Sequence, residues 1–274
     1  MFPQLLAGPI MRFQDIDSQL EQIEKLDNTV DFNYGIELFF RGLIKKVVFA
    51  DHLGMLIDPC FSTGANMNMA LAWAAILGYT LQIYFDFSGY SDMAIAIGRC
   101  LGFRFPENFK APYTSANPAE FWRRWHITLS TWLRDYIYIL MGGNRKGNLR
   151  TLQNLMVTML IGGLWHGAAW TFIFWGFWHG FMLCIHRLTP RSVLEKIPKG
   201  LSVLMLNFGV IIGWVFFRLP TMEQALSFLK NMAGFGPQIA VLIPWQLFLL
   251  IPAGYFLHFL ERYELDHPLP KRIP

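Results

Sequence analysis

The sequence predicts an all-α protein, a polytopic transmembrane helical bundle in which residues 1–274 form a single membrane domain. Composition is the first observation behind this prediction. Of the 274 residues, 54% are hydrophobic and only 15% are charged, whereas a soluble domain usually carries about 25% charged residues. The second is a mean hydropathy of +0.33. Helices suit such a chain because lipid requires backbone polar groups to be paired within each segment.

The first hundred residues contain two candidate spans. Residues 15–27, DIDSQLEQIEKLD, are typical of a short polar helix. Residues 34–57 are apolar but are interrupted by three basic residues. Residues 70–98 are a stronger candidate, because a bilayer requires ~20 apolar residues. Asp86 and Asp92 lie inside that second span, and we expect both carboxylates to have a structural role.

Residues 99–150 form a basic, aromatic-rich region that we expect at the membrane interface or partly inside the membrane. The segment NPAEFWRRWHITLSTWLRDYIYI, residues 117–139, begins with Asn-Pro, a helix-start signal. It then mixes Trp and Arg with apolar residues, which is typical of an interfacial or re-entrant helix. The glycine-rich residues 142–148, GGNRKGN, predict a turn.

Residues 151–187 are too long for one ordinary span and predict a helical hairpin. Glycines predict where the hairpin is broken, either at Gly162 and Gly163 or at Gly167. With this hairpin, residues 150 and 187 lie on the same side of the membrane.

The distribution of charge predicts the orientation of the bundle. Lys and Arg gather in residues 99–150 and 187–199, whereas residues 51–98 contain neither. Because basic loops stay in the cytoplasm, both basic segments are expected on the cytoplasmic side of a bacterial inner membrane. Residues 201–218 and 240–260 predict two further spans of this multi-pass protein, and residues between them predict an external loop.

The composition also limits the classes of ligand. The isoelectric point near 9.0 is better explained by basic loops beside apolar spans than by binding of nucleic acid. Cys60, Cys100 and Cys184 show neither a CxxC pair nor a metal-ligand spacing. The sequence therefore predicts no metal site, no disulfide framework and no permanently bound cofactor.

Two Trp-His-Gly triplets place imidazoles in apolar surroundings. They are Trp165-His166-Gly167 and Trp178-His179-Gly180, and no Lys, Arg, Asp or Glu falls between residues 152 and 186. An ionisable side chain inside an apolar span is a functional hypothesis by default. The alternative is a buried histidine that is hydrogen-bonded to a neighbouring carbonyl.

Several motifs in this order resemble the membrane-bound O-acyltransferase (MBOAT) family, in particular its bacterial branch of alginate O-acetylation and D-alanyl transfer proteins. The resemblance runs from residue 2 to about residue 188. Known members carry several spanning helices before the first of these motifs, so the chain is expected to be N-terminally incomplete. The motifs are FPQLLAGPIMRF, YFDFSGYSDMAIAIG, RFPENFKAPY, WRRWHITLSTWLRDYIYI, GGNR and GGLWHGAAWTFIFWGFWHG.

The resemblance implies a membrane O-acyltransferase. Such an enzyme takes an acyl group, expected to be acetyl, from a cytoplasmic co-substrate such as acetyl-CoA. It passes the group to hydroxyls of an exported polysaccharide such as alginate, directly or through periplasmic acetyltransferase relay proteins.

The resemblance also implies roles for five residues. His166 would be the essential active-site histidine, either as a general base or as a transient acyl carrier. His126 would orient a substrate or stabilise the oxyanion. Arg123 and Arg124 are candidates for binding the donor phosphates, although contact with anionic membrane lipid explains them equally well. Trp165 is a candidate substrate contact.

His179 is expected to serve helix packing. It lies 13 residues after His166, which is about 220° around a continuous helix. The two imidazoles cannot share one face of such a helix.

Two other functions stay open at this point. A polysaccharide transporter would also have intramembrane charges and aromatic linings, but it is expected to show internal repeats, and the doubled Trp-His-Gly is the one repeat found. A non-catalytic subunit of an exopolysaccharide assembly complex would not require a histidine beside the break in a hairpin.

Overall fold

The computed structural model consists of helices joined by turns and short extended segments. Within the residues that it describes, every regular element is a helix, which confirms the all-α prediction. The polar helix predicted at residues 15–27 lies outside the described residues, except for Asp17 and Gln19. The described residues are 9–10, 17, 19, 28–62, 67–237 and 243–267.

Two helices in the described part of the chain are long and apolar enough to cross a membrane. They are α4 (Met69–Cys100) and α10 (Lys199–Arg218), and they match the spans predicted at residues 70–98 and 201–218. A helix of ~20 residues is ~30 Å long, which equals the thickness of the hydrocarbon core of a bilayer.

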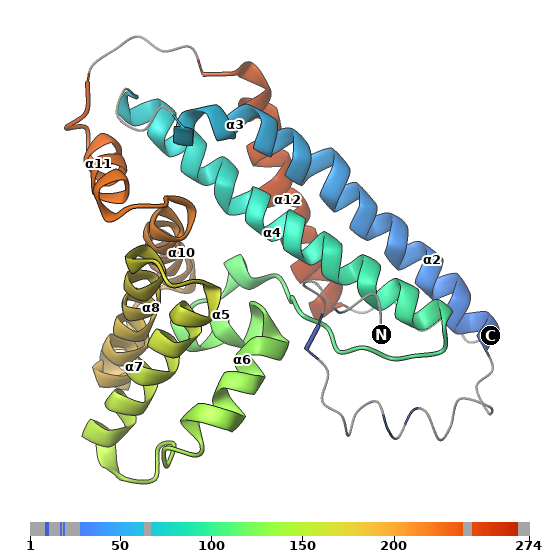
Figure 1. Ribbon diagram of the computed structural model, residues 1–274, viewed down its shortest axis with the longest axis horizontal. Helices are drawn as coiled ribbons and strands as arrows, with labels where there is room; N and C mark the ends of the chain where they lie inside the picture. Colours follow the sequence, from blue (N-terminus) through green and yellow to red (C-terminus); the bar gives the residue numbers. More distant parts are fainter. Residues whose placement is uncertain are drawn as a thin grey trace.

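One continuous helical stretch precedes α4 and lies beside it (Figure 1). It comprises α2 (Asn28–Ile44), the π-helical segment η3 (Lys45–Asp51) and α3 (His52–Ser62). The span predicted at residues 34–57 is contained in this stretch, which is longer than predicted at both ends.

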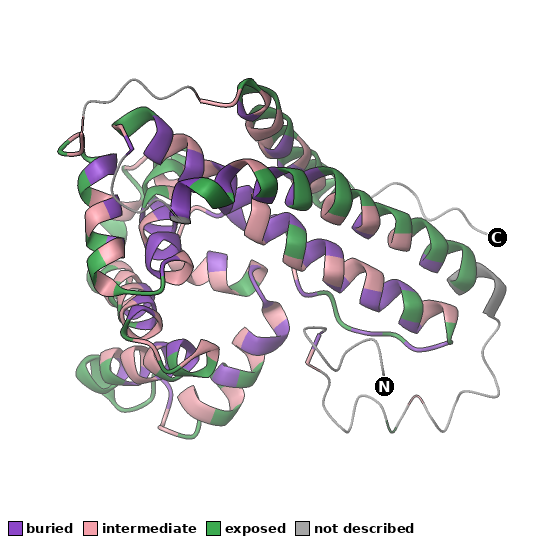
Figure 2. Ribbon diagram, turned by 45° about the horizontal axis from the view of Figure 1, so that its top comes forward, coloured by how far each residue is buried: buried purple, intermediate pink, exposed green. Residues whose placement is uncertain are grey.

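Glycines bring α2 and α4 into backbone contact. A Cβ atom on Gly42 would lie 2.6 Å from the carbonyl oxygen of Gly89, and a Cβ atom on Gly89 would lie 2.7 Å from the carbonyl oxygen of Gly42. Small residues permit this close approach between helices in membranes. Much of α2 is exposed (Figure 2), including the large apolar side chains of Phe32, Phe40 and Ile44. Such an apolar surface suits contact with lipid.

An ionic cluster ties the C-terminal helix α12 (Trp245–Asp266) to this helix pair. The Lys45 Nζ atom lies 2.7 Å from Asp92 Oδ2 and 2.6 Å from Glu261 Oε1. The Tyr84 hydroxyl donates a hydrogen bond to the second oxygen of Glu261. Three helical segments therefore share one lysine, and α12 occupies the position predicted for the span at residues 240–260.

Both carboxylates of α4 have ion-pair partners. Asp92 contacts Lys45, and Asp86 Oδ1 lies 2.6 Å from Lys46 Nζ. A charge removed from water is costly unless it is paired. These contacts agree with the structural role predicted for Asp86 and Asp92.

The single helix predicted at residues 117–139 is wrong. The structure divides it into α5 (Pro118–Arg124), α6 (Ile127–Leu133) and the π-helical segment η5 (Arg134–Tyr138). Its start is correct, because the Asn117 side chain accepts a hydrogen bond from the backbone N–H of Glu120 at 2.8 Å. The interruption lies at Trp125 and His126.

The turn predicted at residues 142–148 is confirmed. Gly142, Gly143 and Gly147 all have positive φ angles, of 104°, 56° and 83°. This left-handed region is accessible to glycine at little cost.

Residues 151–187, where the sequence predicts a hairpin, form α7 (Gly147–His166) and α8 (Trp170–Leu188), which are joined by residues 167–169 and pack against each other. Of the two predicted break points, Gly167 is correct. Gly163 instead lies inside α7, where a Cβ atom would lie 2.3 Å from the carbonyl oxygen of Phe172. On α8, a Cβ atom on Gly176 would lie 2.4 Å from the carbonyl oxygen of Met159.

α10 packs against α8, where the Trp178 indole donates to the Gly209 carbonyl at 2.7 Å. The region after α10 differs from the predicted loop, because it contains the helix α11 (Met222–Met232). The Thr221 hydroxyl caps this helix by accepting from the backbone N–H of Gln224 at 3.2 Å. The remaining short helices are η4 (Pro112–Thr114) and α9 (Arg191–Leu194).

The contact between α7 and α8 makes a prediction about stability. The substitution Gly176→Ala should lower the free energy of unfolding by about 1–3 kcal/mol, because the added methyl group meets backbone atoms that cannot rotate away. Gly200→Ala is the matched control, since no atom lies within 4 Å of a Cβ at that position. Thermal unfolding of the two variants in detergent tests this packing. Equal melting temperatures for both would contradict it.

Candidate functional site

A segment that we name the 126–143 arm runs antiparallel to α7. Near one end, the Asn154 amide donates to the Gly143 carbonyl at 2.8 Å. In the middle, a Cβ atom on Gly162 would lie 3.2 Å from the side chain of Leu133. At the other end, the rings of His126 and Trp165 have centroids 6.2 Å apart. The arm therefore carries His126 to the C-terminal end of α7, ~30 Å from the turn that precedes this helix.

The backbone of His126 is held in an unusual conformation. Its φ of 42° and ψ of 55° lie in the left-handed region, which costs a non-glycine residue roughly 1–2 kcal/mol. Hydrogen bonds accepted by Asn108, which lies in the segment before η4, offset this cost. The Asn108 carbonyl accepts from the N–H of Ile127 at 2.9 Å, and its side-chain oxygen accepts from the N–H and hydroxyl of Thr128 at 3.2 and 3.0 Å. Asn108 thus caps α6 in place of His126.

The side chain of His126 is buried among aromatic rings. The ring of Phe87 lies edge-to-face with it at a centroid distance of 4.7 Å. Within the described part of the chain, Nδ1 has no hydrogen-bond partner. A buried polar atom is normally paired, so this nitrogen is suited to bind a substrate group.

His166 is the last residue of α7 and is partly buried. Its imidazole is surrounded by rings from three helices. The ring centroids of Trp165, Trp175 and Phe217 lie 5.0, 5.1 and 5.0 Å away, all close to edge-to-face. α7, α8 and α10 together therefore fix the position of this imidazole beside the break in the hairpin.

Trp165 lies between the two predicted site histidines. Its indole contacts His126 on the 126–143 arm and His166 on α7. The Trp165 side chain is nevertheless 55% exposed, so it offers a flat apolar surface next to both imidazoles. The structure thus brings together three residues that the sequence separates by up to 40 positions.

The two candidate arginines differ in their surroundings. Arg124 Nη2 lies 2.8 Å from Glu120 Oε1, and Nη1 donates to the Lys110 carbonyl at 3.3 Å. These contacts join α5 to the extended segment that holds Asn108. Arg123 is exposed. The sequence does not distinguish the two arginines. In the structure Arg124 is engaged by Glu120 and Lys110, so the exposed Arg123 is the better candidate to bind a negatively charged substrate.

His179 is completely buried in α8, at 0% exposure. Its ring packs against Trp122 and Trp175, with centroids 5.1 and 4.9 Å away. The expectation that His166 and His179 lie on different faces assumed a continuous helix, and the break at Gly167 removes that assumption. Both histidines contact Trp175.

Sequence reasoning missed Asn108, Trp175 and Phe217. Asn108 stands in the motif RFPENFKAPY, where an asparagine between charged and aromatic residues is a signal that could have been followed. Nothing local distinguishes Trp175 or Phe217 from the other aromatics of their helices. Only the crossing of α8 and α10 places these two rings against His166.

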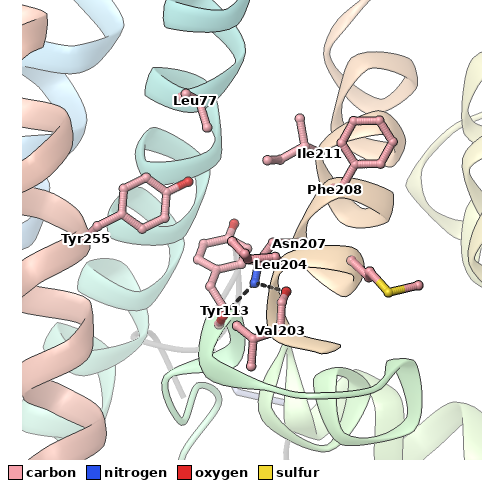
Figure 3. Close-up of a pocket in the computed structure, with 9 residues that line it drawn as sticks. Leu77, Tyr113, Val203, Leu204, Asn207, Phe208, Ile211 and Tyr255 are labelled. Atoms are coloured by element: carbon pink, nitrogen blue, oxygen red, sulfur yellow. Dashed lines mark hydrogen bonds between the residues drawn. The ribbon is translucent and has the colours of Figure 1, made fainter. Parts of the chain in front are cut away.

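A cavity of about 740 Å³ opens between α4, α10 and α12, with Tyr113 of η4 at one end (Figure 3). Its walls are mostly apolar, and Leu77, Ile211 and Tyr255 contribute to them. The Asn207 amide donates to the carbonyls of Tyr113 and Val203, at 2.8 Å each. None of the predicted site residues lines this cavity, so it is separate from the histidine site.

In the described residues, no group of three or more His, Cys, Asp and Glu side chains is arranged to hold a metal ion. Within the same residues, Cys60, Cys100 and Cys184 form no disulfide bond.

Comparison with curated proteins gives relatives of three kinds. The chain is 45% identical to a probable alginate O-acetylase, AlgI, of Pseudomonas putida, over 100% of this chain and 58% of the relative. It is 43% identical to a peptidoglycan O-acetyltransferase of Helicobacter pylori, over 85% of this chain and 45% of the relative. It is 32% identical to a teichoic acid D-alanyltransferase of Streptococcus thermophilus, over 72% of this chain and 51% of the relative. The chain spans about half the length of these relatives.

The family model matches most of the chain, including the segments that carry the two histidines. Residues 1–228 match the family described as MBOAT, membrane-bound O-acyltransferase family. The match includes the 126–143 arm, α7, α8 and both histidines that meet at Trp165. This chain belongs to the membrane-bound O-acyltransferase family.

Proposed function

We propose that this chain carries the acyl-transfer site of a multi-pass bacterial inner-membrane enzyme that O-acetylates an exported polysaccharide. The observation that carries the proposal is the meeting of His126 and His166 at Trp165, in apolar surroundings, at the far end of a hairpin. At this place one imidazole can act as a general base while the other donates a hydrogen bond. Membership of an acyltransferase family supports this chemistry over transport.

In the proposed reaction, His166 acts on the acceptor hydroxyl. Its imidazole takes the hydroxyl proton while the oxygen attacks the carbonyl carbon of the acyl thioester, and a new C–O bond forms. The carbonyl oxygen becomes an oxyanion, which a hydrogen bond from His126 stabilises. The carbon–sulfur bond then breaks, the thiolate of the donor leaves, and it takes up the proton held by His166.

The relatives support acetyl as the group transferred and a polysaccharide as the acceptor. Relatives whose names specify O-acetylation are 43–49% identical to this chain, whereas the D-alanyltransferases are 30–32% identical. Acetyl-CoA is the proposed donor, and Arg123, which is exposed on α5, is the candidate to bind its phosphates. An alginate-like polysaccharide is the proposed acceptor, reached directly or through periplasmic relay proteins.

The orientation follows from the hairpin. α7 begins and α8 ends beside the basic segments at residues 99–150 and 187–199. With the basic turn at residues 142–150 and the segment 187–199 in the cytoplasm, His166 lies toward the opposite face of the membrane, and residues 126–143 carry His126 from that turn to the same end of α7. A donor from the cytoplasm would then meet an exported acceptor inside the bundle.

His166→Gln should nearly abolish acyl transfer. Glutamine keeps a similar bulk and can form hydrogen bonds, but it cannot take up a proton near neutral pH. A general base contributes about 10²–10⁴-fold to the rate, so a loss of that size is expected with insertion unchanged. Radiolabelled acetyl transfer to polysaccharide in membranes that carry the intact protein is the measurement.

The matched control is His52→Gln, because His52 is exposed on α3 and its Nδ1 atom lies 2.8 Å from the Val47 carbonyl oxygen. This variant should retain the wild-type rate. Near-normal transfer by correctly inserted His166→Gln protein would show that the histidine is structural.

Arg123→Ala should raise the KM for acetyl-CoA about tenfold, because an interaction with a charged group contributes about 1.5–3 kcal/mol. Arg124→Ala should instead lower the melting temperature, since it removes the ion pair with Glu120 and the bond to the Lys110 carbonyl. Donor titrations and thermal unfolding of both variants separate the two roles. An unchanged donor KM in Arg123→Ala would assign that residue to lipid contact.

The two ends of α7 should be accessible from opposite sides of the membrane. After replacement of the three native cysteines, Lys146→Cys should react with an impermeant maleimide only from the cytoplasmic side. Ala168→Cys, in the exposed turn after His166, should react from the periplasmic side. Labelling of Lys146→Cys from the periplasm alone would reverse the proposed orientation.

A further inference from the structure

His179 is enclosed by aromatic rings on all the elements that pack against it. Trp175 lies on its own helix, Phe121 and Trp122 come from α5, and Trp214 comes from α10. The side chain is 0% exposed. A phenylalanine would fill the same space and make the same ring contacts.

The polar atoms of this enclosure are unpaired. Among the residues that the structure describes, neither ring nitrogen of His179 has a hydrogen-bond partner, and the same is true of the indole nitrogens of Trp122 and Trp175. A buried polar group without a partner costs about 1–3 kcal/mol. Packing alone therefore does not explain why a histidine occupies this position.

α10 is shaped to accept the imidazole edge. A Cβ atom on Gly213 would lie 2.8 Å from His179 Nε2, so a side chain at that position would collide with the ring. The absence of a side chain at Gly213 lets the nitrogen edge of His179 approach the backbone of α10.

Trp175 connects this enclosure to the acyl-transfer site. One edge-to-face contact joins its indole to His179, at a centroid distance of 4.9 Å and an interplanar angle of 62°. A second joins it to His166, at 5.1 Å and 86°. The same indole also contacts Phe217, which is itself against His166. A rotation of Trp175 would therefore move the rings that hold His166.

We propose that His179 is a positioning residue for acyl transfer, which fixes the orientation of Trp175 and through it the imidazole of His166. In this role one bound water links the polar edge of His179 to the indole N–H groups of Trp122 and Trp175. This role rests on the proposed function of His166. It makes the second Trp-His-Gly triplet part of the site rather than packing alone.

The decisive variant is His179→Phe, which keeps the ring and removes both nitrogens. If His179 positions His166, kcat should fall about 10–100-fold, because a small misplacement of a catalytic group has effects of this size. The KM for acetyl-CoA should stay unchanged, since donor binding involves other residues. His179→Gln, which restores a hydrogen-bonding group, should recover part of the loss.

A double variant tests the path through Trp175. Trp175→Phe should also lower kcat, and the combined His179→Phe and Trp175→Phe protein should be no slower than the slower single variant. Residues that act through one contact have non-additive effects. Full additivity of the two losses would overturn the proposed path.

Phe228→Leu controls for loss of stability, because Phe228 is a buried aromatic of α11 that stacks on Phe61 away from Trp175. It should lower the melting temperature without changing kcat. A wild-type kcat in His179→Phe, with His166→Gln inactive, would overturn the positioning role alone. Full activity of His166→Gln would overturn the proposed function and this role together.

Discussion

The site depends on the backbone contact between α7 and α8 at Gly163 and Gly176. Each glycine faces a carbonyl oxygen of the other helix, at a distance where a Cβ atom would collide. Because the helices are so close, three residues are enough to join them. The contact also sets which side chains of α8 reach the end of α7, and it places Trp175 against His166.

The second histidine arrives by a different route. The 126–143 arm follows α7 in the opposite direction, so that His126 and His166, which are 40 residues apart in the sequence, both contact Trp165. The left-handed backbone at His126 would be unfavourable alone, at roughly 1–2 kcal/mol. Three hydrogen bonds to Asn108 offset it, at about 1 kcal/mol each. The arm can therefore turn sharply at the residue that it delivers to the site.

Paired charges and unpaired imidazoles lie on different helices of this apolar chain. The charges of α2, η3, α4 and α12 are paired with one another, as in the cluster around Lys45. This arrangement limits the cost of removing charge from water, and it joins helices distant in sequence. The imidazoles of His126 and His179 have ring nitrogens that the described residues leave unpaired. These ring nitrogens are therefore available to form hydrogen bonds with a substrate or with another polar group of the site.

The sequence by itself determined the helical class, the spans matched by α4 and α10, the turn before α7, and two helices in residues 151–187 with two alternative break points, of which the structure uses Gly167. These features are encoded locally, since hydropathy, glycine content and helix caps act over one or two turns of chain. It also singled out His166, because imidazoles in apolar segments are rare, and His126, because the surrounding motifs resemble one family.

Only the tertiary structure decided that α5 and α6 are separate, because the interruption at His126 is held by Asn108, which is distant in sequence and gives no local signal at Trp125 or His126. It also distinguished Arg124, which an ion pair and a backbone carbonyl engage, from the exposed Arg123. In the sequence nothing distinguishes Trp175 from the other aromatic residues of α8. The packing of α7, α8 and α10 places its indole in contact with His166 and His179. Contacts between distant segments depend on how helices pack, and the pattern of residues within any one helix does not contain that information.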